Sequence, residues 1–495
     1  MMKKYARAAI AAGLVCLTGA AHAQETLTPA QARDVDALIE AGLKDDLAWD
    51  ILESVTTEGG PRLAATEAEA RARDWGAAKL KSLGFKNVRI EPFEMPMWRR
   101  VAEEAEIVSP FPQKLVIAAL GRSSATPEGG VTAEVVRFRS VADLASAPQT
   151  GLEGKIVFVD EPMARTQDGS GYGPAVRKRG LAAVEAGKRG AVAALIRSVG
   201  TDNHRNPHTG GAARAPDLTP VPTAALSNPD ADQLARALER AKGPVTVRVN
   251  IQVETADSAP SGNVVGEIPG QTDELIVIGG HLDSWDLGTG AVDDGAGIAI
   301  TTAAAKLVDN LKGKPKRTIR VVMWGAEEVG VYGGAAYAEA HKDEIGKHIV
   351  AAESDFGAGR VWRFDTGFGE EALAKGEVMK GALSRLAIVP GDNSATGGAD
   401  IGGIRRLGVP VADLVQDGSK YFDTRPTTRS TRWTRKSSAR MSRPGRRSST
   451  WRRKWKGTSA ASRRRRRSRG QPASATRFRL ARLCSEAGPI AGSAK

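Results

Sequence analysis

The chain has 495 residues, a formal net charge of +14, two cysteines and 41% hydrophobic residues. The hydrophobic content is sufficient for packed cores, which excludes a wholly disordered chain, and two cysteines exclude a disulfide-stapled scaffold. No run of eighteen apolar residues occurs, so the sequence predicts no membrane-spanning helix. The length alone indicates about three domains of ordinary size.

The positive charge is confined to one end of the chain. Residues 425–495 hold 23 Lys and Arg against one acid, a net of +22, whereas residues 1–424 hold 48 basic and 56 acidic side chains, a net of −8. The basic segment has too few large apolar residues to form a core, and we expect it to be disordered. The charge therefore gives no reason to expect a nucleic-acid or membrane partner for the folded body.

Residues 1–23 have the pattern of a secretory signal peptide. Lys3, Lys4 and Arg7 precede an apolar stretch at 8–17, and Ala-His-Ala at 21–23 supplies small residues for cleavage. We therefore expect the protein to be secreted or periplasmic.

The residues after the predicted signal peptide divide into three segments that differ in composition and in hydrophobic pattern. Residues 24–108 form the first part of the predicted catalytic domain. Thr28 and Pro29 predict the start of a helix there, and the patterns that follow predict a second helix at 65–83 and a strand at 87–90. Residues 109–253 are richer in Gly, Pro and short β runs, with strands at 155–159 and 190–195 around a helix at 181–187. This composition predicts a β-rich domain that is inserted into the catalytic domain.

Residues 254–424 show an α/β rhythm. Apolar strands are predicted at 275–278, 319–324 and 348–352, with a helix at 296–307. Short buried strands that alternate with helices indicate an α/β fold with a mostly parallel mixed sheet and helices on both faces. Ligands in such sheets gather at the carboxyl ends of the strands.

Candidate metal ligands follow each predicted strand. His281 and Asp283 follow the first strand, Glu327 and Glu328 the second, and Asp355 the third; Asp293 lies in an acidic turn between the first two. One imidazole and several carboxylates suit Zn(II). Carboxylates that converge without basic partners repel one another, and bound cations remove that repulsion.

Three motifs in this order resemble a known family. GGHLDSWDLGTGAVDDGAG, WGAEEVGVYGG and ESD are similar to the co-catalytic dizinc exopeptidases, in particular those like plasma glutamate carboxypeptidase (carboxypeptidase Q) and bacterial secreted aminopeptidases. The resemblance covers roughly residues 24–424. It implies a zinc exopeptidase fold whose insertion, 109–253, is a protease-associated-type domain.

The resemblance also implies roles for single residues. It assigns two zinc ions per chain, held by His281, Asp293, Glu328 and Asp355, with Asp293 as the bridging carboxylate. Glu327 becomes the general base, which takes a proton from the attacking water. Asp283 is expected to hold the second nitrogen of the His281 imidazole.

Other polar residues have simpler interpretations. Asp294, before Gly295, is expected to cap a helix rather than bind metal. His204 and His208 are expected in an exposed loop because Pro207 prevents a helix, and His341 and His348 are expected to be solvated. Trp285, Asp400 and Tyr421 either line a substrate cleft or serve as packing and turn residues.

One ligand of the family pattern is missing. The family supplies a further His after a Tyr-Phe segment, whereas this chain continues from Tyr421 and Phe422 through Asp423 and Thr424 into Arg425, and no His follows His348. If the bases that encode Thr424–Thr434 are read in the frame that starts two bases later, they can encode Thr-Pro-Asp-Asp-Pro-Leu-Asp-Thr-Leu-Asp. The codon before this stretch would then encode His or Tyr. We therefore hypothesise that 425–495 is out-of-frame translation; the alternative is a genuine basic tail.

The expected activity is hydrolysis of dipeptides or of terminal residues of short peptides. The alternative is a catalytically impaired pseudoenzyme or binding module, because one His ligand is missing. Glutaminyl-peptide cyclisation on a related fold is less favoured, since the insertion and the Ala-Glu-Glu motif are typical of the peptidases. The sequence leaves open aminopeptidase, carboxypeptidase or dipeptidase action, the side-chain preference and the oligomeric state, with a homodimer as one option.

Overall fold

The computed structural model describes residues 26–213 and 221–423. The predicted signal peptide at 1–23 and the basic segment at 425–495 lie outside the described residues. Among the helices in the described ranges, none is long and apolar enough to cross a bilayer.

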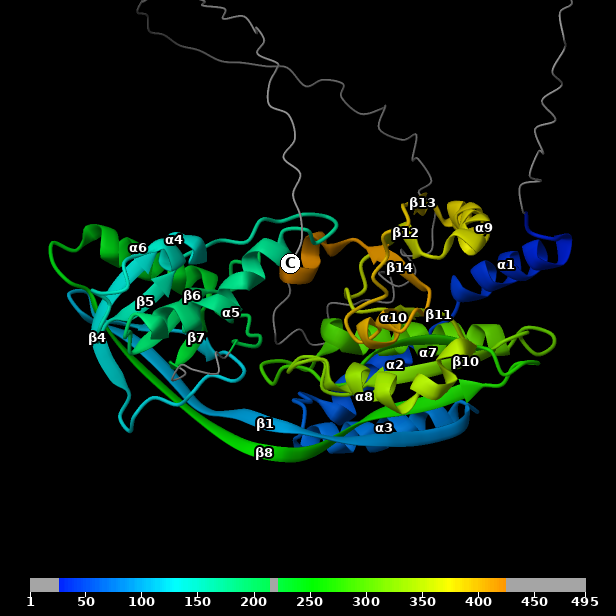
Figure 1. Cartoon of the computed structure of the whole chain (residues 1–495), viewed down its shortest axis with the longest axis horizontal. Coiled ribbons are helices and arrows are strands. Elements are labelled where there is room, and N and C mark those ends of the chain that lie inside the picture. Colours follow the sequence, from blue (N-terminus) through cyan, green and yellow to red (C-terminus); the bar gives the residue numbers. More distant parts are fainter. Residues whose placement is uncertain (1–25, 214–220, 424–495) are drawn as a thin grey trace, which may run out of the picture. The chain divides into compact units, whose positions relative to one another are not determined.

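The predicted apolar strands form the centre of a mixed sheet (Figure 1). β9 (Leu275–His281) lies between β10 (Thr318–Trp324) and β11 (His348–Glu353), and both neighbours run parallel to it. Next to β11 lies the parallel β14 (Val411–Gln416), followed by the antiparallel β12 (Val361–Gly367) and the edge strand β13 (Val389–Pro390). The three predicted strands are therefore confirmed, and they lie side by side.

Helices cover both faces of this sheet, as predicted. Ile319, Val321 and Met323 of β10 pack in one buried cluster with residues of α2, α3 and α7, whereas Val322 and Trp324 pack in another with residues of α8 and α10. This alternation follows from the two-residue period of a strand. The helices of this part are α1 (Pro29–Gly42), α2 (Leu47–Ser54), α3 (Glu67–Ser82), α7 (Ala296–Asp309), α8 (Tyr332–Ala340), α9 (Leu373–Leu383) and α10 (Gly402–Arg406).

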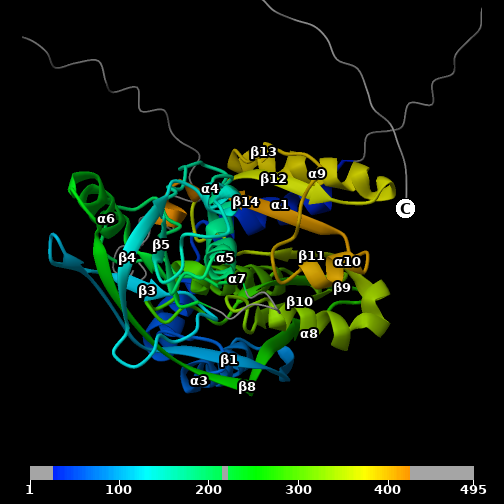
Figure 2. The same cartoon turned by 60° about the vertical axis from the view of Figure 1, so that its left-hand side comes forward.

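Two long antiparallel strands extend beyond the central sheet. β1 (Lys86–Ser109) pairs with β8 (Thr246–Ile268) along nearly its whole length, and β8 also pairs with β10 (Figure 2). The register of the β1–β8 pair shifts between Met95 and Met97 and again between Arg100 and Ala102. The sequence predicted only 87–90 of β1 as strand, because prolines and charged residues interrupt the alternating pattern farther along. The strand forms there because β8 supplies a partner along its length.

The chain between these two strands forms its own layered unit. β4 (Val131–Phe138), β5 (Ile156–Val159), β6 (Ala193–Arg197) and β7 (Thr223–Leu226) form a parallel sheet in that order, and β4 joins β8. The other elements are β2 (Gln113–Leu115), β3 (Ile117–Ala119), α4 (Val141–Ser146), α5 (Tyr172–Lys188) and α6 (Asn228–Arg240). The segment thus carries helices as well as strands, and it is less purely β than the sequence predicted.

Candidate metal centre

The carboxyl ends of β9, β10 and β11 meet at one edge of the sheet. His281 is the last residue of β9 and pairs with Trp324, the last residue of β10, while Glu353 at the end of β11 pairs with Gly279. Because the three strands are parallel, the residues that follow them gather at the same place. Pairing of these three strands therefore brings together the motifs that follow them.

His281, Asp293 and Asp355 converge at this edge. The His281 Nε2 atom lies 3.0 Å from Asp293 Oδ1, 3.5 Å from Asp355 Oδ1 and 4.0 Å from Glu327 Oε2. One ring nitrogen of His281 and one carboxylate oxygen each of Asp293 and Asp355 all lie within 4.8 Å of one another. His281 is fully buried, so the group faces inward from the strand ends.

Glu328 lies on the same cavity but outside this group of three. Its Oε1 atom accepts a hydrogen bond from the backbone N–H of Trp285 at 3.3 Å. Glu327 and Glu328 both line the cavity next to Asp293. Of the four residues predicted as ligands, Asp293, Glu328 and Asp355 thus line the cavity, and the buried His281 contacts Asp293 and Asp355.

Asp283 connects the first two motifs. The His281 Nδ1 atom lies 2.9 Å from the main-chain oxygen of Asp283, whereas the carboxylate Oδ1 of Asp283 is 3.5 Å away. That carboxylate instead accepts hydrogen bonds from the backbone N–H groups of Glu327 at 2.9 Å and Glu328 at 3.2 Å. Asp283 therefore orients the imidazole through its backbone and the two glutamates through its side chain.

The loop that carries Asp293 is held by a buried arginine that the sequence analysis missed. Arg62 donates from Nε to Leu282 O at 2.6 Å and from Nη1 to Thr289 O at 2.6 Å, and its Nη2 reaches Gly290 O at 3.1 Å. Gly290 has a φ of 57°, in the left-handed region that favours glycine. No local pattern marks Arg62, because its partners are main-chain oxygens more than 200 residues away.

Asp294 serves the start of α7, as the sequence indicated. Its Oδ1 atom accepts a hydrogen bond from Gly297 N–H at 2.9 Å, and its Oδ2 atom accepts one from His281 N–H at 3.1 Å. The peptide bond between Asp293 and Asp294 is cis. Asp294 thus points into the protein while Asp293 faces the cavity.

The electrostatics indicate an excess of negative charge. Burial, together with the neighbouring carboxylates, raises the pKa of Glu327 and Glu328 well above the ordinary value, and it raises the pKa of Asp355. Burial opposes protonation of His281, but Asp355 and the other acids around it raise its pKa well above the ordinary value. Asp355 Oδ1 is buried and accepts no hydrogen bond. This donor set fits a divalent cation, because a cation both neutralises the acids and satisfies the unpartnered oxygen.

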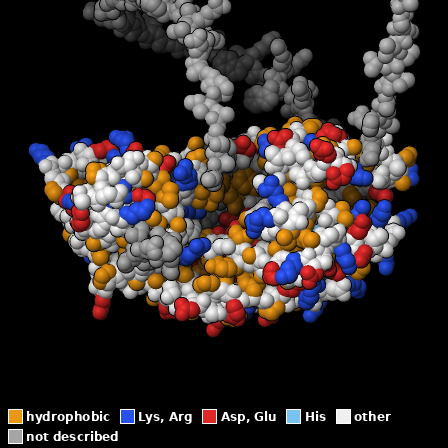
Figure 3. Space-filling model, viewed as in Figure 1, with side chains coloured by type: hydrophobic (Ala, Val, Ile, Leu, Met, Phe, Trp, Pro, Cys, Tyr) orange, Lys and Arg blue, Asp and Glu red, His pale blue; other side chains and the backbone are white. Residues whose placement is uncertain are grey.

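A cavity of about 350 Å³ opens onto these residues. Figure 3 shows the hollow in this face of the molecule, with acidic side chains visible inside it. Trp285 and Tyr421 line the cavity, whereas Asp400 is buried behind it and accepts a hydrogen bond from Gly334 N–H at 3.0 Å. The volume lies in the usual range for small-ligand sites.

The final described turn is tied to the inserted segment. In the 3-10 turn Gly418–Asp423, the ring of Phe422 stacks on Tyr172 with centroids 4.9 Å apart, and Phe422 O accepts a hydrogen bond from Thr201 N–H at 2.8 Å. Arg165 and Asp423 form an ion pair at 2.9 Å. Residues from both sides of the cavity are therefore in contact at this turn.

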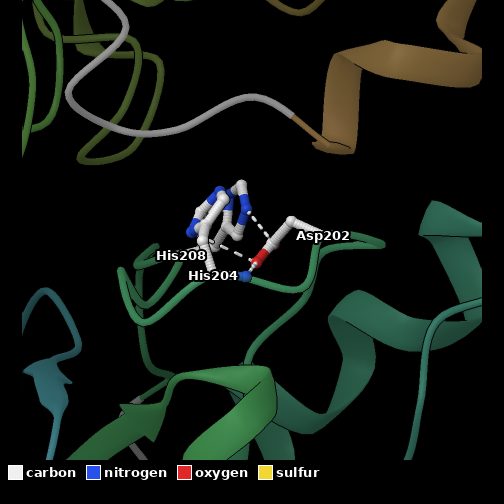
Figure 4. A group of neighbouring side chains, drawn as sticks. All are labelled: Asp202, His204 and His208. Carbon is white, nitrogen blue, oxygen red and sulfur yellow. Dashed lines mark hydrogen bonds and ion pairs between the residues drawn. The ribbon is translucent and has the colours of Figure 1, made fainter.

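A second His–Asp group lies in the inserted segment (Figure 4). His208 Nε2 is 2.6 Å from Asp202 Oδ2, and His204 Nδ1 is 3.3 Å from Asp202 Oδ1. Both histidines lie in a loop, as predicted, but only 14% and 16% of their side chains are exposed, so the expected solvent exposure is wrong. Both rings pair with the buried Asp202 carboxylate, a partner that the sequence analysis did not identify.

The prediction of solvated positions is also wrong for the two later histidines. His341 pairs with Glu344 at 2.6 Å and with Glu91 at 3.1 Å. His348 is buried and its Nε2 lies 3.1 Å from the hydroxyl of Tyr337. The partners are Glu91 on β1 for His341 and Tyr337 on α8 for His348, and neither contact follows from the local sequence pattern.

Comparison with known proteins identifies the family. The profile of Peptidase family M28 matches residues 263–441. Carboxypeptidase Q of Xenopus laevis is 35% identical over 394 residues, which cover 79% of this chain and 82% of the relative. The chain belongs to peptidase family M28. The resemblance drawn from the three motifs is thereby confirmed, and the protein is a metallopeptidase.

Other relatives of this M28 peptidase agree. Human Carboxypeptidase Q is 33% identical over 383 residues, or 77% of this chain and 79% of the relative. The crystal structure of a Peptidase M28 precursor from Shewanella amazonensis is 44% identical, with a TM-score of 0.81, over 83% of this chain and 94% of that one. A zinc aminopeptidase from Bacillus subtilis is 16% identical with a TM-score of 0.56, over 80% and 93% of the two chains, and is similar in fold.

Proposed function

We propose that this M28 peptidase is an exopeptidase that binds two zinc ions and hydrolyses dipeptides or terminal residues of short peptides. His281, Asp293 and Asp355 would hold one ion, and Asp293 and Glu328 the second, with Asp293 bridging. The observation that carries the proposal is the convergence of His281, Asp293 and Asp355 within 4.8 Å, where one imidazole faces several carboxylates and Asp355 Oδ1 accepts no hydrogen bond. The carboxypeptidase and aminopeptidase names of the relatives support the reaction class.

The chemistry follows from the placement of the side chains. Bound zinc ions supply Lewis-acid polarisation of the scissile carbonyl and lower the pKa of water. Glu327 takes a proton from the attacking water and passes it to the leaving amine. Asp283 fixes the backbone of Glu327 through the 2.9 Å hydrogen bond, so the base is held at the mouth of the cavity.

Metal content and hydrolysis test this proposal together. Purified protein should contain zinc by elemental analysis, and cleavage of a dipeptide should stop when a chelator removes it and resume when zinc is restored. Cleavage that is insensitive to the chelator would refute the metal mechanism.

A second candidate, an impaired enzyme or binding module, is favoured by the missing His. Tyr421 and Phe422, after which the family pattern places its last ligand, line the cavity. We infer that a frame slip near Asp423 removed that ligand. Resequencing codons 420–430 tests this inference, and an uninterrupted frame there would refute the slip. The protein encoded after correction of one base, here called the frame-restored enzyme, should be active, whereas the present chain should be only weakly active.

The proposal extends to the organisation of the chain. Residues 1–23 would direct export, and 109–253 would form a protease-associated-type domain inserted between 24–108 and the remainder of the catalytic domain at 254–424. A buried cluster formed only by residues between 120 and 225 supports the last point. N-terminal sequencing of the exported protein should begin at Gln24; a start at Met1 would exclude the cleavage.

A further inference from the structure

A second cavity, of about 200 Å³, shares one wall residue with the catalytic cavity described above. Its walls come from residues 95–98 of β1, residues 255–257 of β8, and Val329 and Tyr332 at the start of α8. Among the described residues, Trp285 is the one that lines both cavities. The backbone N–H of Trp285 also donates to Glu328 Oε1 at 3.3 Å. An occupant of the second cavity would therefore contact a residue of the catalytic cavity without entering that cavity.

The lining of the second cavity is rich in sulfur and in aromatic rings. Met95 and Met97 contribute thioether sulfurs, and Trp98, Trp285 and Tyr332 contribute rings. Aromatic rings attract one another in offset-stacked or edge-to-face arrangements, and a thioether sulfur makes a favourable contact with a ring edge. This lining therefore favours an aromatic ring over an aliphatic group of the same size.

Short side chains and a bulge explain why this space is not filled by the protein itself. The register of the β1–β8 pair places Met95 opposite Ala259 but Met97 opposite Ala256, so β8 carries one additional residue there. Such a bulge bends the strand and redirects its side chains. The buried cluster beside the cavity contains one methionine and two alanines: Ala64, Met95 and Ala326. An apolar cavity of about 150 Å³ already holds benzene, so a single aromatic ring fits here.

The two tryptophan walls are held by Arg100, a buried residue of β1. Its guanidinium carbon lies 5.5 Å from the ring centroid of Trp98 and 5.5 Å from that of Trp285. The guanidinium also forms an ion pair with Asp286, next to Trp285, and Trp98 Nε1 donates to Ser123 O at 2.9 Å. Because these walls are ordered without an occupant, little conformational freedom is lost when a ring binds.

Arg100 also connects the second cavity to the inserted segment. That segment supplies the cationic part of the catalytic cavity, Arg179 with His208, and also Thr209. Thr209 Oγ1 accepts a hydrogen bond from Arg100 Nη1 at 3.0 Å. On the side of Gly121, a Cβ atom would lie 2.5 Å from Cη2 of Trp285, so glycine leaves the space that the ring needs. The position of Trp285 is thus defined by contacts on β1 and on the inserted segment.

From these contacts we propose that the second cavity is a binding site for an aromatic ring, supplied by a free aromatic compound or by an aromatic side chain of a peptide. The ring contacts the thioethers of Met95 and Met97 and packs on Trp285. Arg122 and Asp257, both exposed, also line the cavity, so a polar substituent on the ring meets polar groups. The site is distinct from the metal centre, and its binding of a ring does not depend on the proposed function.

Two probes of matched shape test the proposal without any need for catalysis. The full chain is titrated with p-cresol and with 4-methylcyclohexanol, and binding is followed by ligand-observed NMR. The aromatic probe should bind about 2- to 10-fold more tightly than its saturated counterpart. Ala256→Phe fills the cavity from β8 and should weaken p-cresol binding about 10-fold or more. Ala259→Phe, the same change on the same strand but outside the cavity lining, is the matched control and should bind p-cresol as wild type does.

A milder variant keeps the test valid if Ala256→Phe fails to fold. Met97→Leu preserves the side-chain volume but removes the sulfur, so it should weaken p-cresol about 2- to 10-fold and leave 4-methylcyclohexanol unchanged. Equal binding of the two probes by wild type, or p-cresol binding that neither variant weakens, would overturn the proposal.

A third compound identifies the source of the ring. N-acetyl-tyrosine N-methylamide carries the ring of p-cresol on an uncharged peptide backbone. Displacement of p-cresol by this compound would support the proposal with aromatic side chains of peptides as the occupant. Binding of p-cresol without displacement would support it with free aromatic compounds as the occupant.

Discussion

The two His–Asp groups of this protein contain similar residues in opposite electrostatic settings. At the end of β9, one histidine, His281, is surrounded by carboxylates; burial and the neighbouring acids raise the pKa of Glu327 and Glu328, whereas, although burial opposes it, the hydrogen bond to His281 lowers the pKa of Asp293. In the inserted segment, two histidines share one carboxylate, and although burial opposes it, the hydrogen bond to His208 lowers the pKa of Asp202. The first group needs a cation, whereas the second is already compensated.

The difference shows that proximity alone does not define a metal site. Both groups bring three donor residues within 4.8 Å. In the second group, both oxygens of Asp202 already accept hydrogen bonds, one from the backbone N–H of His204 at 3.2 Å and one from His208 Nε2. In the first group, Asp355 Oδ1 accepts none. We therefore assign metal binding to the first group and orientation of His208 to the second.

The largest expected effect distinguishes the two aspartates. Asp293→Asn should remove most of the bound zinc and abolish dipeptide cleavage by the frame-restored enzyme, because it takes away the bridging carboxylate. Asp202→Asn, the same change in the second group, should leave the zinc content unchanged. Elemental analysis of both variants measures this, and a parallel loss of zinc in Asp202→Asn would show that the second group also binds metal.

The general base gives the next effect. Glu327→Gln in the frame-restored enzyme should lower kcat about 10²- to 10⁴-fold while zinc is retained, because the side chain accepts a proton rather than holding the metal. Steady-state kinetics and zinc analysis on one preparation are the measurement. Glu339→Gln, an exposed glutamate on α8, is the control. A kcat close to wild type in Glu327→Gln would assign the proton transfer to another residue.

Metal removal should make stability depend on pH. In metal-free protein the pKa values of Glu327, Glu328, Glu353 and Asp355 are raised, mainly through burial, and that of Glu353 reaches about 8 against an ordinary 4.5. The folded state then binds more protons than the unfolded state, so the free energy of unfolding falls as pH rises from about 4.5 to 8. Denaturant titrations should show this slope without zinc and a flatter one with zinc; identical slopes would contradict the charge argument.

A smaller effect is expected at the second group. Gly200→Ala places a methyl group against His208 and Asp202 and should separate them. Because His208 lines the catalytic cavity, KM for a dipeptide should rise about 2- to 10-fold, with zinc content and kcat little changed. Gly173→Ala, on α5 with open space around it, is the control. An unchanged KM would limit His208 to a structural role.

The central sheet and first His–Asp group could be predicted because their signals are local. The apolar runs that became β9, β10 and β11 are each followed directly by chemistry-bearing residues, so strand order was enough to bring His281 and Asp355 together. The capping residue Thr28 and the helix at 67–82 were likewise marked by sequence patterns alone.

The second group and the cationic part of the cavity could not be predicted in this way. Arg179 and Asp293 are 114 positions apart, and no periodicity relates α5 to the turn after β9. Arg62 binds main-chain oxygens, which carry no sequence signature. These features depend on how the inserted segment packs against the cavity, and only tertiary structure shows it.

The register shifts in the β1–β8 pair have a mechanical consequence. Bulges increase local twist and allow a strand pair to bend, and two of the four register shifts of this pair lie at 95–102, between the central sheet and the inserted segment. The same two strands link the inserted segment to the central sheet, since β4 pairs with one end of β8 and β10 with the other. Substitutions at 95–102 are therefore expected to act on the catalytic cavity through the strand pair.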